Sequence, residues 1–151
     1  MAIEASTRSF IHGMQRKVFY CHQATFSIYS NARYKTNRIL NMNEAYDYAT
    51  ILNENKDIGG PDSARKHIPP SLYDVFGFFF PNSYKVFHSA IVVDDTPKVM
   101  LAECDNRQCF VRIHSLEEVL LRFKEYYKEY DVSWYSKESI NIGINLIWAS
   151  R

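Results

Sequence analysis

Three side chains of this sequence have the types and the order that thiol chemistry requires. Cys21 lies where a helix could begin, and the dipole of a helix favours a thiolate in its first turn. His88 lies near the start of an apolar run over residues 86–93, where a single imidazole is unusual. Gln15, six residues before Cys21, carries an amide that could donate to an oxyanion. Together they could provide a nucleophile, its base and an oxyanion donor.

A predicted hairpin places an acid beside this imidazole. Residues 94–97, Asp-Asp-Thr-Pro, form a turn cluster between the run that contains His88 and a second run, 99–102. The outer ends of antiparallel arms lie side by side, so the end of the second arm should lie near His88. Glu103 and Asp105 both follow that arm on one face, and their spacing does not choose between them.

The segments that would hold these residues predict an α+β fold, with an antiparallel sheet of about five strands and helices packed on it. The strands are expected over residues 75–80, 86–93, 98–103, 108–113 and 140–148. The helices are expected over about 21–33, 43–53 and 115–130.

Four of these predictions depend on particular residue types. The segment after Cys21 is rich in aromatic and β-branched residues, which slightly favour a strand, so only the thiol hypothesis requires a helix there. Asn43 is a plausible N-cap for the second helix, and Ser115 with Glu118 forms a capping box for the third. Residues 140–148 alternate apolar and polar side chains, which is typical of a half-buried strand.

Composition limits the class of protein. A chain of 151 residues that is 46% hydrophobic is expected to fold as one domain, 1–151, with residues 1–14 as an arm and 55–70 as a long loop. The net charge of +1 gives no argument for nucleic acid as a partner. No motif implies a cofactor, and three cysteines are too few for a disulfide framework.

The same sequence indicates where the protein acts. No apolar run reaches the roughly 18 residues of a membrane-spanning helix. The first ten residues contain an early acid and lack the apolar segment of a signal peptide. We therefore expect a protein that is cytoplasmic or delivered into a host cell, with a peptide or a protein as its substrate or partner.

Gln15, Cys21, His88 and an acid about 15 to 18 residues later resemble the papain-like cysteine peptidases in order and spacing. The likeness is nearest to the bacteriocin-processing peptidase domains of ABC-type exporters and to related cell-wall amidases. It implies a papain-like half-barrel that cuts a peptide or amide bond. It also implies Gln15 as oxyanion donor, Cys21 as nucleophile, His88 as general base and acid, and Asp105 as the residue that orients the imidazole.

The sequence departs from that family at two places and leaves a second class of function open. His22 follows Cys21 where such enzymes have a small residue or Trp, and Asn106 follows Asp105 where the exporter domains have Pro. The alternative is a non-catalytic α+β interaction protein, such as a pathogen accessory or immunity-type binder. An enzyme predicts a partly exposed Cys21 of low pKa within reach of His88, whereas a binder predicts a buried, inert thiol.

Two other arrangements use some of the same residues. In a permuted site, His88 and Glu103 would precede a nucleophile near Tyr135 and Ser136, although serine stands there in place of cysteine. A zinc site would use thiolate and imidazole ligands, but the available spacing matches no common zinc pattern, so no metal is expected. Its ligands would be Cys104, Cys109 and His114.

Overall fold

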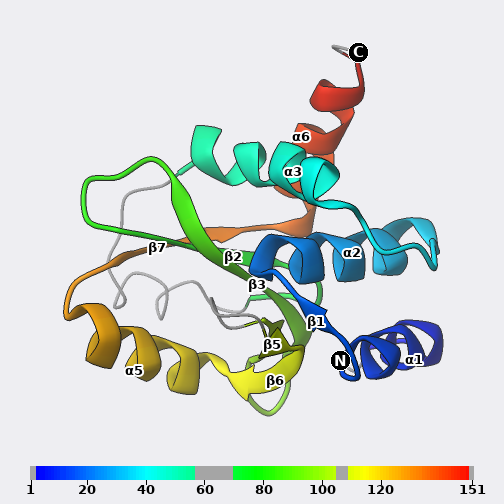
Figure 1. Ribbon diagram of the computed structural model, residues 1–151, viewed down its shortest axis with the longest axis horizontal. Helices are drawn as coiled ribbons and strands as arrows, with labels where there is room; N and C mark the ends of the chain where they lie inside the picture. Colours follow the sequence, from blue (N-terminus) through cyan, green and yellow to red (C-terminus); the bar gives the residue numbers. More distant parts are fainter. Residues whose placement is uncertain (1–2, 57–69, 105–108, 150–151) are drawn as a thin grey trace.

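The computed structural model describes residues 3–56, 70–104 and 109–149. Within them lie five helices and an open, five-stranded antiparallel sheet with helices packed against it, which confirms the predicted α+β class (Figure 1). The sheet has the order β6-β4-β3-β2-β7, and a separate two-stranded sheet pairs β1 with β5. The strands are β1 Val18–Phe19, β2 Val75–Phe79, β3 Val86–Asp94, β4 Met100–Glu103, β5 Cys109–Phe110, β6 Arg112–Ser115 and β7 Asp131–Tyr135. The helices are α1 Ala5–Met14, α2 Cys21–Tyr34, α3 Met42–Glu54, α5 Leu116–Tyr127 and α6 Lys137–Ala149.

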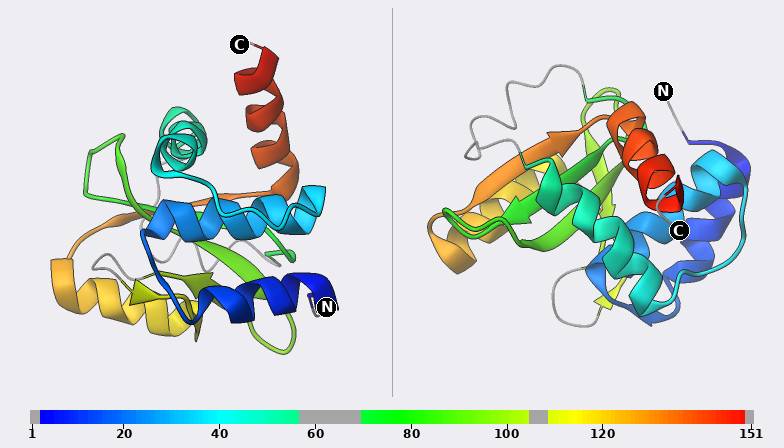
Figure 2. Two further views of the ribbon diagram at one scale, coloured as in Figure 1. Left: turned by 45° about the vertical axis from the view of Figure 1, so that its right-hand side comes forward. Right: turned by 90° about the horizontal axis from the view of Figure 1, so that it is seen from above.

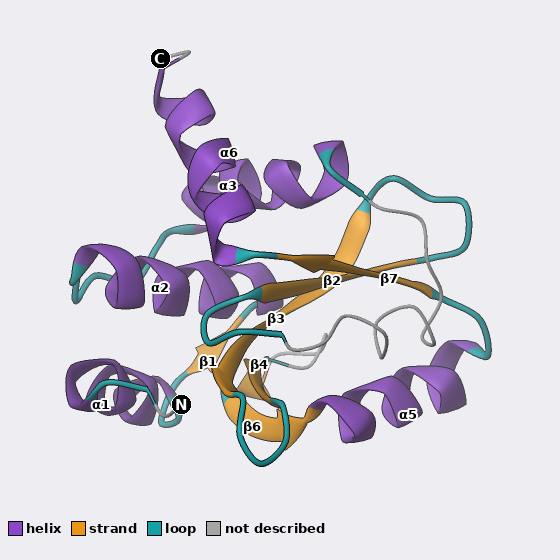
Figure 3. Cartoon of the chain, turned by 180° about the vertical axis from the view of Figure 1, so that it is seen from behind, coloured by secondary structure: helices purple, strands orange, loops and turns teal. Residues whose placement is uncertain are grey.

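Helices cover both faces of the main sheet. Figures 1 and 3 show α2, α3 and α6 on one side and α5 on the other. The side chains of β2 alternate between the two layers: Val75 and Phe79 join the core under α2 and α3, whereas Phe76 and Phe78 join the core under α5. A central strand that is buried on both faces therefore appears in the sequence as a continuous apolar run.

The predicted hairpin is formed by β3 and β4. They pair antiparallel, with Ile91 opposite Ala102 and Val92 opposite Leu101. This register brings the end of β4 towards the first half of β3, where His88 lies.

One of the two predicted helix N-caps, Ser115, is confirmed, and the other, Asn43, is wrong. Ser115 Oγ accepts a hydrogen bond from the Glu118 amide at 3.1 Å, and the Glu118 carboxylate accepts one from the Ser115 amide at 3.3 Å. The expected helix over 43–53 begins slightly earlier, because Asn41 and not Asn43 is its N-cap and accepts a hydrogen bond from the Glu44 amide. The helix that follows Cys21 forms despite its strand-favouring residues, since much of its length is buried in the core.

The prediction of a strand over residues 140–148 is wrong, because this segment lies in α6. The fifth strand of the sheet is β7, which pairs with β2. In the helix, Ile140 and Ile144 face the core at a spacing of four, while Ile142 and Leu146 are exposed. Apolar residues at every second position also lie four residues apart, so this alternation fits both a half-buried strand and one face of a helix and did not distinguish the two.

Two other predicted boundaries also differ from the structure. The N-terminal segment 1–14 was expected as an arm, but α1 occupies most of it and buries Ile11 and Met14 in the core. The strand expected over 108–113 is divided into β5 and β6. Most of the predicted loop over 55–70 lies outside the described residues. No helix in the described part of the chain is long and apolar enough to cross a membrane.

Replacing Gly143 by Ala should weaken the contact of α6 with α3, which lie beside each other in Figure 2. A Cβ at Gly143 would lie 2.6 Å from Cγ2 of the buried Ile51, and overpacking of this kind costs about 1–3 kcal/mol. Alanine gains about 1 kcal/mol of helix propensity, which offsets only part of that cost. Urea unfolding should therefore show a net loss of stability.

Gly13→Ala is the matched control for this substitution. A Cβ at Gly13 would have no heavy atom within 4 Å, so the propensity gain should stand alone and leave the protein as stable or more stable. Equal effects of the two substitutions would contradict the close packing of α6 against Ile51.

Candidate functional site

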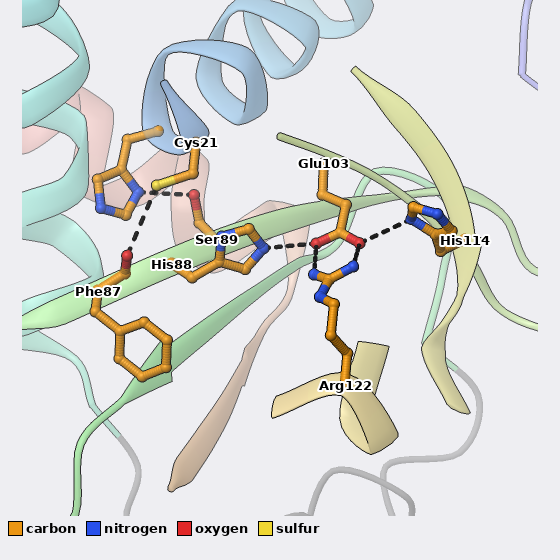
Figure 4. Close-up of polar contacts among 8 residues, drawn as sticks. Cys21, Phe87, His88, Ser89, Glu103, His114 and Arg122 are labelled. Carbon is orange, nitrogen blue, oxygen red and sulfur yellow. Dashed lines mark hydrogen bonds and ion pairs between the residues drawn. The ribbon is translucent and has the colours of Figure 1, made fainter. Parts of the chain in front are cut away.

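Cys21 is the first residue of α2, and neighbouring contacts fix the start of that helix. Gln23 accepts a hydrogen bond from the Tyr20 amide through Oε1 and donates one to the Leu40 carbonyl through Nε2. Sγ of Cys21 lies 3.7 Å from the Phe87 carbonyl oxygen on β3 (Figure 4). The thiol is thus held between the N-terminus of a helix and the central strand β3, and the helix dipole favours its anion.

His88 lies on β3 and is fully buried. Its Nε2 donates a hydrogen bond to Glu103 Oε1 at 2.7 Å, and its ring packs edge-on against Phe123 and beside Phe78. The other ring nitrogen, Nδ1, is also buried and is not held by the carboxylate. With Nε2 held by the carboxylate, Nδ1 is the atom left to exchange a proton with the thiol.

The thiol and the imidazole shift each other's pKa. Burial alone would raise the pKa of Cys21, but hydrogen bonding and charge interactions with His22 and His88 outweigh it and lower the pKa to about 5. Burial would lower the pKa of His88, but Cys21 and Glu103 outweigh it and raise the pKa to about 9. Between these values the pair exists as thiolate and imidazolium, the form in which a cysteine is nucleophilic.

Glu103 is the centre of a buried polar network. Its carboxylate accepts hydrogen bonds from Arg122 at 2.5 and 2.8 Å, from His114 at 3.0 Å and from His88. Burial would raise the pKa of Glu103, but these donors and the charge of His88 hold it far below its usual range. Figure 4 shows the carboxylate between the His88 ring and the guanidinium of Arg122. The acid that orients His88 is therefore itself fixed from two further elements, β6 and α5.

His22 supplies a second imidazole next to the thiol. Its Nδ1 lies 2.8 Å from Ser89 Oγ, and its side chain is almost completely buried. Hydrogen bonding from His22 is one of the causes of the lowered pKa of Cys21. The residue by which this sequence departs from the papain-like pattern thus takes part in the site.

A pocket of about 370 Å³ opens beside the thiol. It lies between the first residues of α2, the first turns of α3 and the start of β3. Its described lining residues are Tyr20, Cys21, His22, Met42, Ala45, Tyr46, Lys85, Val86 and Phe87. Cys21 is only 8% exposed, less than the enzyme hypothesis expected, but its exposed surface faces a cavity large enough for a side chain and part of a peptide backbone.

The structure brings together three of the five predicted site residues. Cys21, His88 and Glu103 interact, and Glu103 fills the orienting position that the spacing left open. Asp105 lies outside the described residues. Gln15 follows the last residue of α1 and is not among the described residues that line the pocket, so its role as oxyanion donor stays a prediction.

The described residues do not form the permuted site, and the side chain of Cys109, one of the three candidate zinc ligands, lies outside the description. Ser136 accepts a hydrogen bond from the Ser139 amide at the start of α6, where it acts as a helix cap. Cys104 is buried, and His114 bonds to Glu103. Within residues 3–56, 70–104 and 109–149, no group of three or more His, Cys, Asp or Glu side chains could hold a metal ion.

Sequence reasoning missed the partners that support this site. Arg122 was not singled out, although it lies three residues after the buried Val119 and next to Phe123, so it borders the apolar face of its helix. A charged residue in that position is a signal for a buried ionic partner. Ser89 gave no signal of its own, because its role depends on the position of His22 on another element.

No protein-family model, no curated protein and no solved structure matches this chain. The interpretation of the site therefore depends on its own geometry.

Proposed function

We propose that this protein is a thiol hydrolase that cuts a peptide or amide bond by means of Cys21, His88 and Glu103. The observation that carries the proposal is the thiol at a helix N-terminus beside an imidazole whose other nitrogen is held by a buried carboxylate. Burial alone raises the pKa of a thiol, so a cysteine that only fills a core is expected to have a raised pKa. The pKa of Cys21 is lowered instead.

In the first half of the reaction, the Cys21 thiolate attacks the carbonyl carbon of the substrate and forms a carbon–sulfur bond. The negative charge moves to the carbonyl oxygen, which the N-terminus of α2 stabilises. The tetrahedral intermediate collapses as the His88 imidazolium donates its Nδ1 proton to the leaving amine. A thioester remains on Cys21, and the amine departs.

In the second half, the neutral imidazole of His88 accepts a proton from water as that water attacks the thioester. The carbon–sulfur bond breaks, the acid product leaves, and the thiolate–imidazolium pair is restored. Glu103 keeps its charge throughout and stabilises the imidazolium while fixing the direction of its ring.

The order of Cys21, His88 and the acid along the chain, the helix at Cys21 and the strand at His88 support assignment to the papain-like group. Glu103 would take the part that the resemblance gave to Asp105. We propose this relationship from the site alone.

Turnover of an activated ester tests the proposal. With p-nitrophenyl acetate at pH 7, the wild-type chain should release many equivalents of nitrophenol, and Cys21→Ala should release none above background. His88→Gln should acylate slowly and stop near one equivalent, because the thioester then lacks a base.

His12→Ala, at an exposed histidine of α1, is the control and should behave as wild type. Release that stops at one equivalent in the wild-type chain would show a reactive thiol without hydrolysis. That result would favour the interaction protein over the enzyme.

A further inference from the structure

We infer that the pocket beside Cys21 selects substrates with a carboxylate close to the bond that is cut, and that Lys85 is the residue that selects them. The inference rests on the proposed function and adds the chemical class of the substrate to it.

Lys85 brings a positive charge to the pocket. Apart from His22, the described residues that line the pocket include one ionisable cation, Lys85, and neither Asp nor Glu. The Lys85 side chain is exposed, and in the described part of the chain its ammonium takes part in no ion pair. An anion in the pocket would therefore meet Lys85 without competing for it against a carboxylate of the protein.

Two other cations, Lys56 and Arg38, are already paired with carboxylates. Lys56 lies 2.8 Å from Asp131 and also donates to the Ser83 carbonyl. Arg38 makes two hydrogen bonds, of 2.6 and 2.7 Å, to Glu44 on α3. Glu44, which precedes the lining residue Ala45 on α3, is thus already paired with Arg38.

The backbone on which Lys85 stands is fixed. The Lys85 amide donates to Ser83 Oγ at 3.1 Å, and the next amide, of Val86, donates to Asn53 Oδ1 at 2.7 Å. Only the side chain of Lys85 has to adapt when an anion binds, so less conformational entropy is lost on binding.

The remaining wall suits the stem of an acidic residue. Met42, Ala45 and Val86 provide an apolar surface, and the exposed rings of Tyr20 and Tyr46 flank it. Methylene groups would pack on this surface while a carboxylate at their end reaches the ammonium. An acidic side chain and a free C-terminal carboxylate both meet this description, and suitable probes distinguish them.

The test uses three probes of nearly the same shape, each with an iodoacetyl group. N-iodoacetylglutaminamide is neutral, N-iodoacetylisoglutamine carries a side-chain carboxylate, and N-iodoacetylglutamine carries a C-terminal carboxylate. In each reaction the Cys21 thiolate displaces iodide and forms a carbon–sulfur bond. Intact-mass measurements at pH 7 and low salt give a rate constant for each probe, and the ratio of acidic to neutral probe reports the selection.

At least one acidic probe should react faster than the neutral one in the wild-type chain. Lys85→Gln should lower that ratio about two- to fivefold, which is the range of a partly exposed ion pair, and Lys85→Glu should lower it further. Added salt should reduce the wild-type ratio towards that of Lys85→Gln. Lys124→Gln, at an exposed lysine of α5, should leave the ratio unchanged.

The probe that responds identifies the source of the carboxylate. A response confined to isoglutamine assigns an acidic side chain, and one confined to glutamine assigns a free C-terminus. Ratios that do not change in either Lys85 variant would overturn the inference while leaving the hydrolase proposal in place. A wild-type Cys21 that reacts with the neutral probe only above about pH 8, as an ordinary thiol does, would instead overturn the proposed function.

Discussion

Alkylation of Cys21 by iodoacetamide should have its pH midpoint near 5, and the His88→Gln variant should move that midpoint up by about two to three pH units. The thiolate is the reacting species, so the rate follows its fraction as pH rises through the thiol pKa. His88 is one of two imidazoles that lower this pKa, and the burial that opposes them remains in the variant. The thiol should therefore return towards the range of an ordinary cysteine.

The midpoint is a better measure than the rate at one pH. A thiolate of higher pKa is also more nucleophilic, which offsets much of the loss of thiolate when rates are compared at a single pH. Glutamine suits position 88 because its amide can still donate to Glu103, whose other donors, Arg122 and His114, are untouched. The fold should therefore survive the substitution.

The pH dependence of hydrolysis should differ from that of alkylation. Alkylation needs only the thiolate and should stay fast above its midpoint. Hydrolysis also needs the imidazolium of His88, whose pKa is raised to about 9, so turnover should fall again above that pH. A midpoint near 8.5 in the wild-type chain, or one that is equal in wild type and His88→Gln, would contradict a thiolate–imidazolium pair.

The pairing of His88 with an acid was predictable because it depends on local chemistry. The turn cluster over residues 94–97 determines the hairpin, and the hairpin places an acid near His88. The spacing did not decide between Glu103 and Asp105, since both lie on one face of an extended strand. The choice of Glu103 depends on Arg122 and His114, whose positions are set by packing between distant elements.

Two helices show the limits of residue patterns in opposite ways. In α2, aromatic and β-branched residues favoured a strand, and only the requirement for a thiol at a helix start predicted the observed structure. In α6, the alternating Ile140 to Leu146 favoured a strand, and no chemical requirement corrected it. Tertiary burial decided both cases, and a sequence window does not contain that information.

The second large effect concerns stability. Glu103→Gln should lower the free energy of unfolding by about 3–5 kcal/mol, because the part-buried Arg122 loses its counter-charge and the fully buried His88 loses one of its two anionic partners. Urea unfolding at pH 7 measures this loss. Glu125→Gln, at an exposed carboxylate of α5, is the control and should change stability by no more than about 0.5 kcal/mol.

The pH dependence gives a second readout of the same carboxylate. The folded-state pKa of Glu103 lies far below its unfolded value, so its contribution is complete above about pH 4.5 and is lost as pH falls below that value. Wild type should therefore lose stability below about pH 4.5, and Glu103→Gln should show less of this decline. An equal loss of stability below about pH 4.5 in wild type and Glu103→Gln would mean that the neighbours of Glu103 do not lower its pKa in the folded state.

A double variant separates the structural role of Glu103 from its chemical role. Glu103→Gln with Arg122→Met removes both members of the Glu103–Arg122 ion pair, and replacing both partners often recovers stability that losing one partner costs. The pKa of His88 should still fall, because its raised value depends partly on Glu103. The pH midpoint of Cys21 alkylation in the double variant should therefore lie above the wild-type midpoint, although the stability of the fold is restored. Recovery of both stability and the low midpoint would mean that Glu103 acts only in folding, and that His88 polarises the thiol without it.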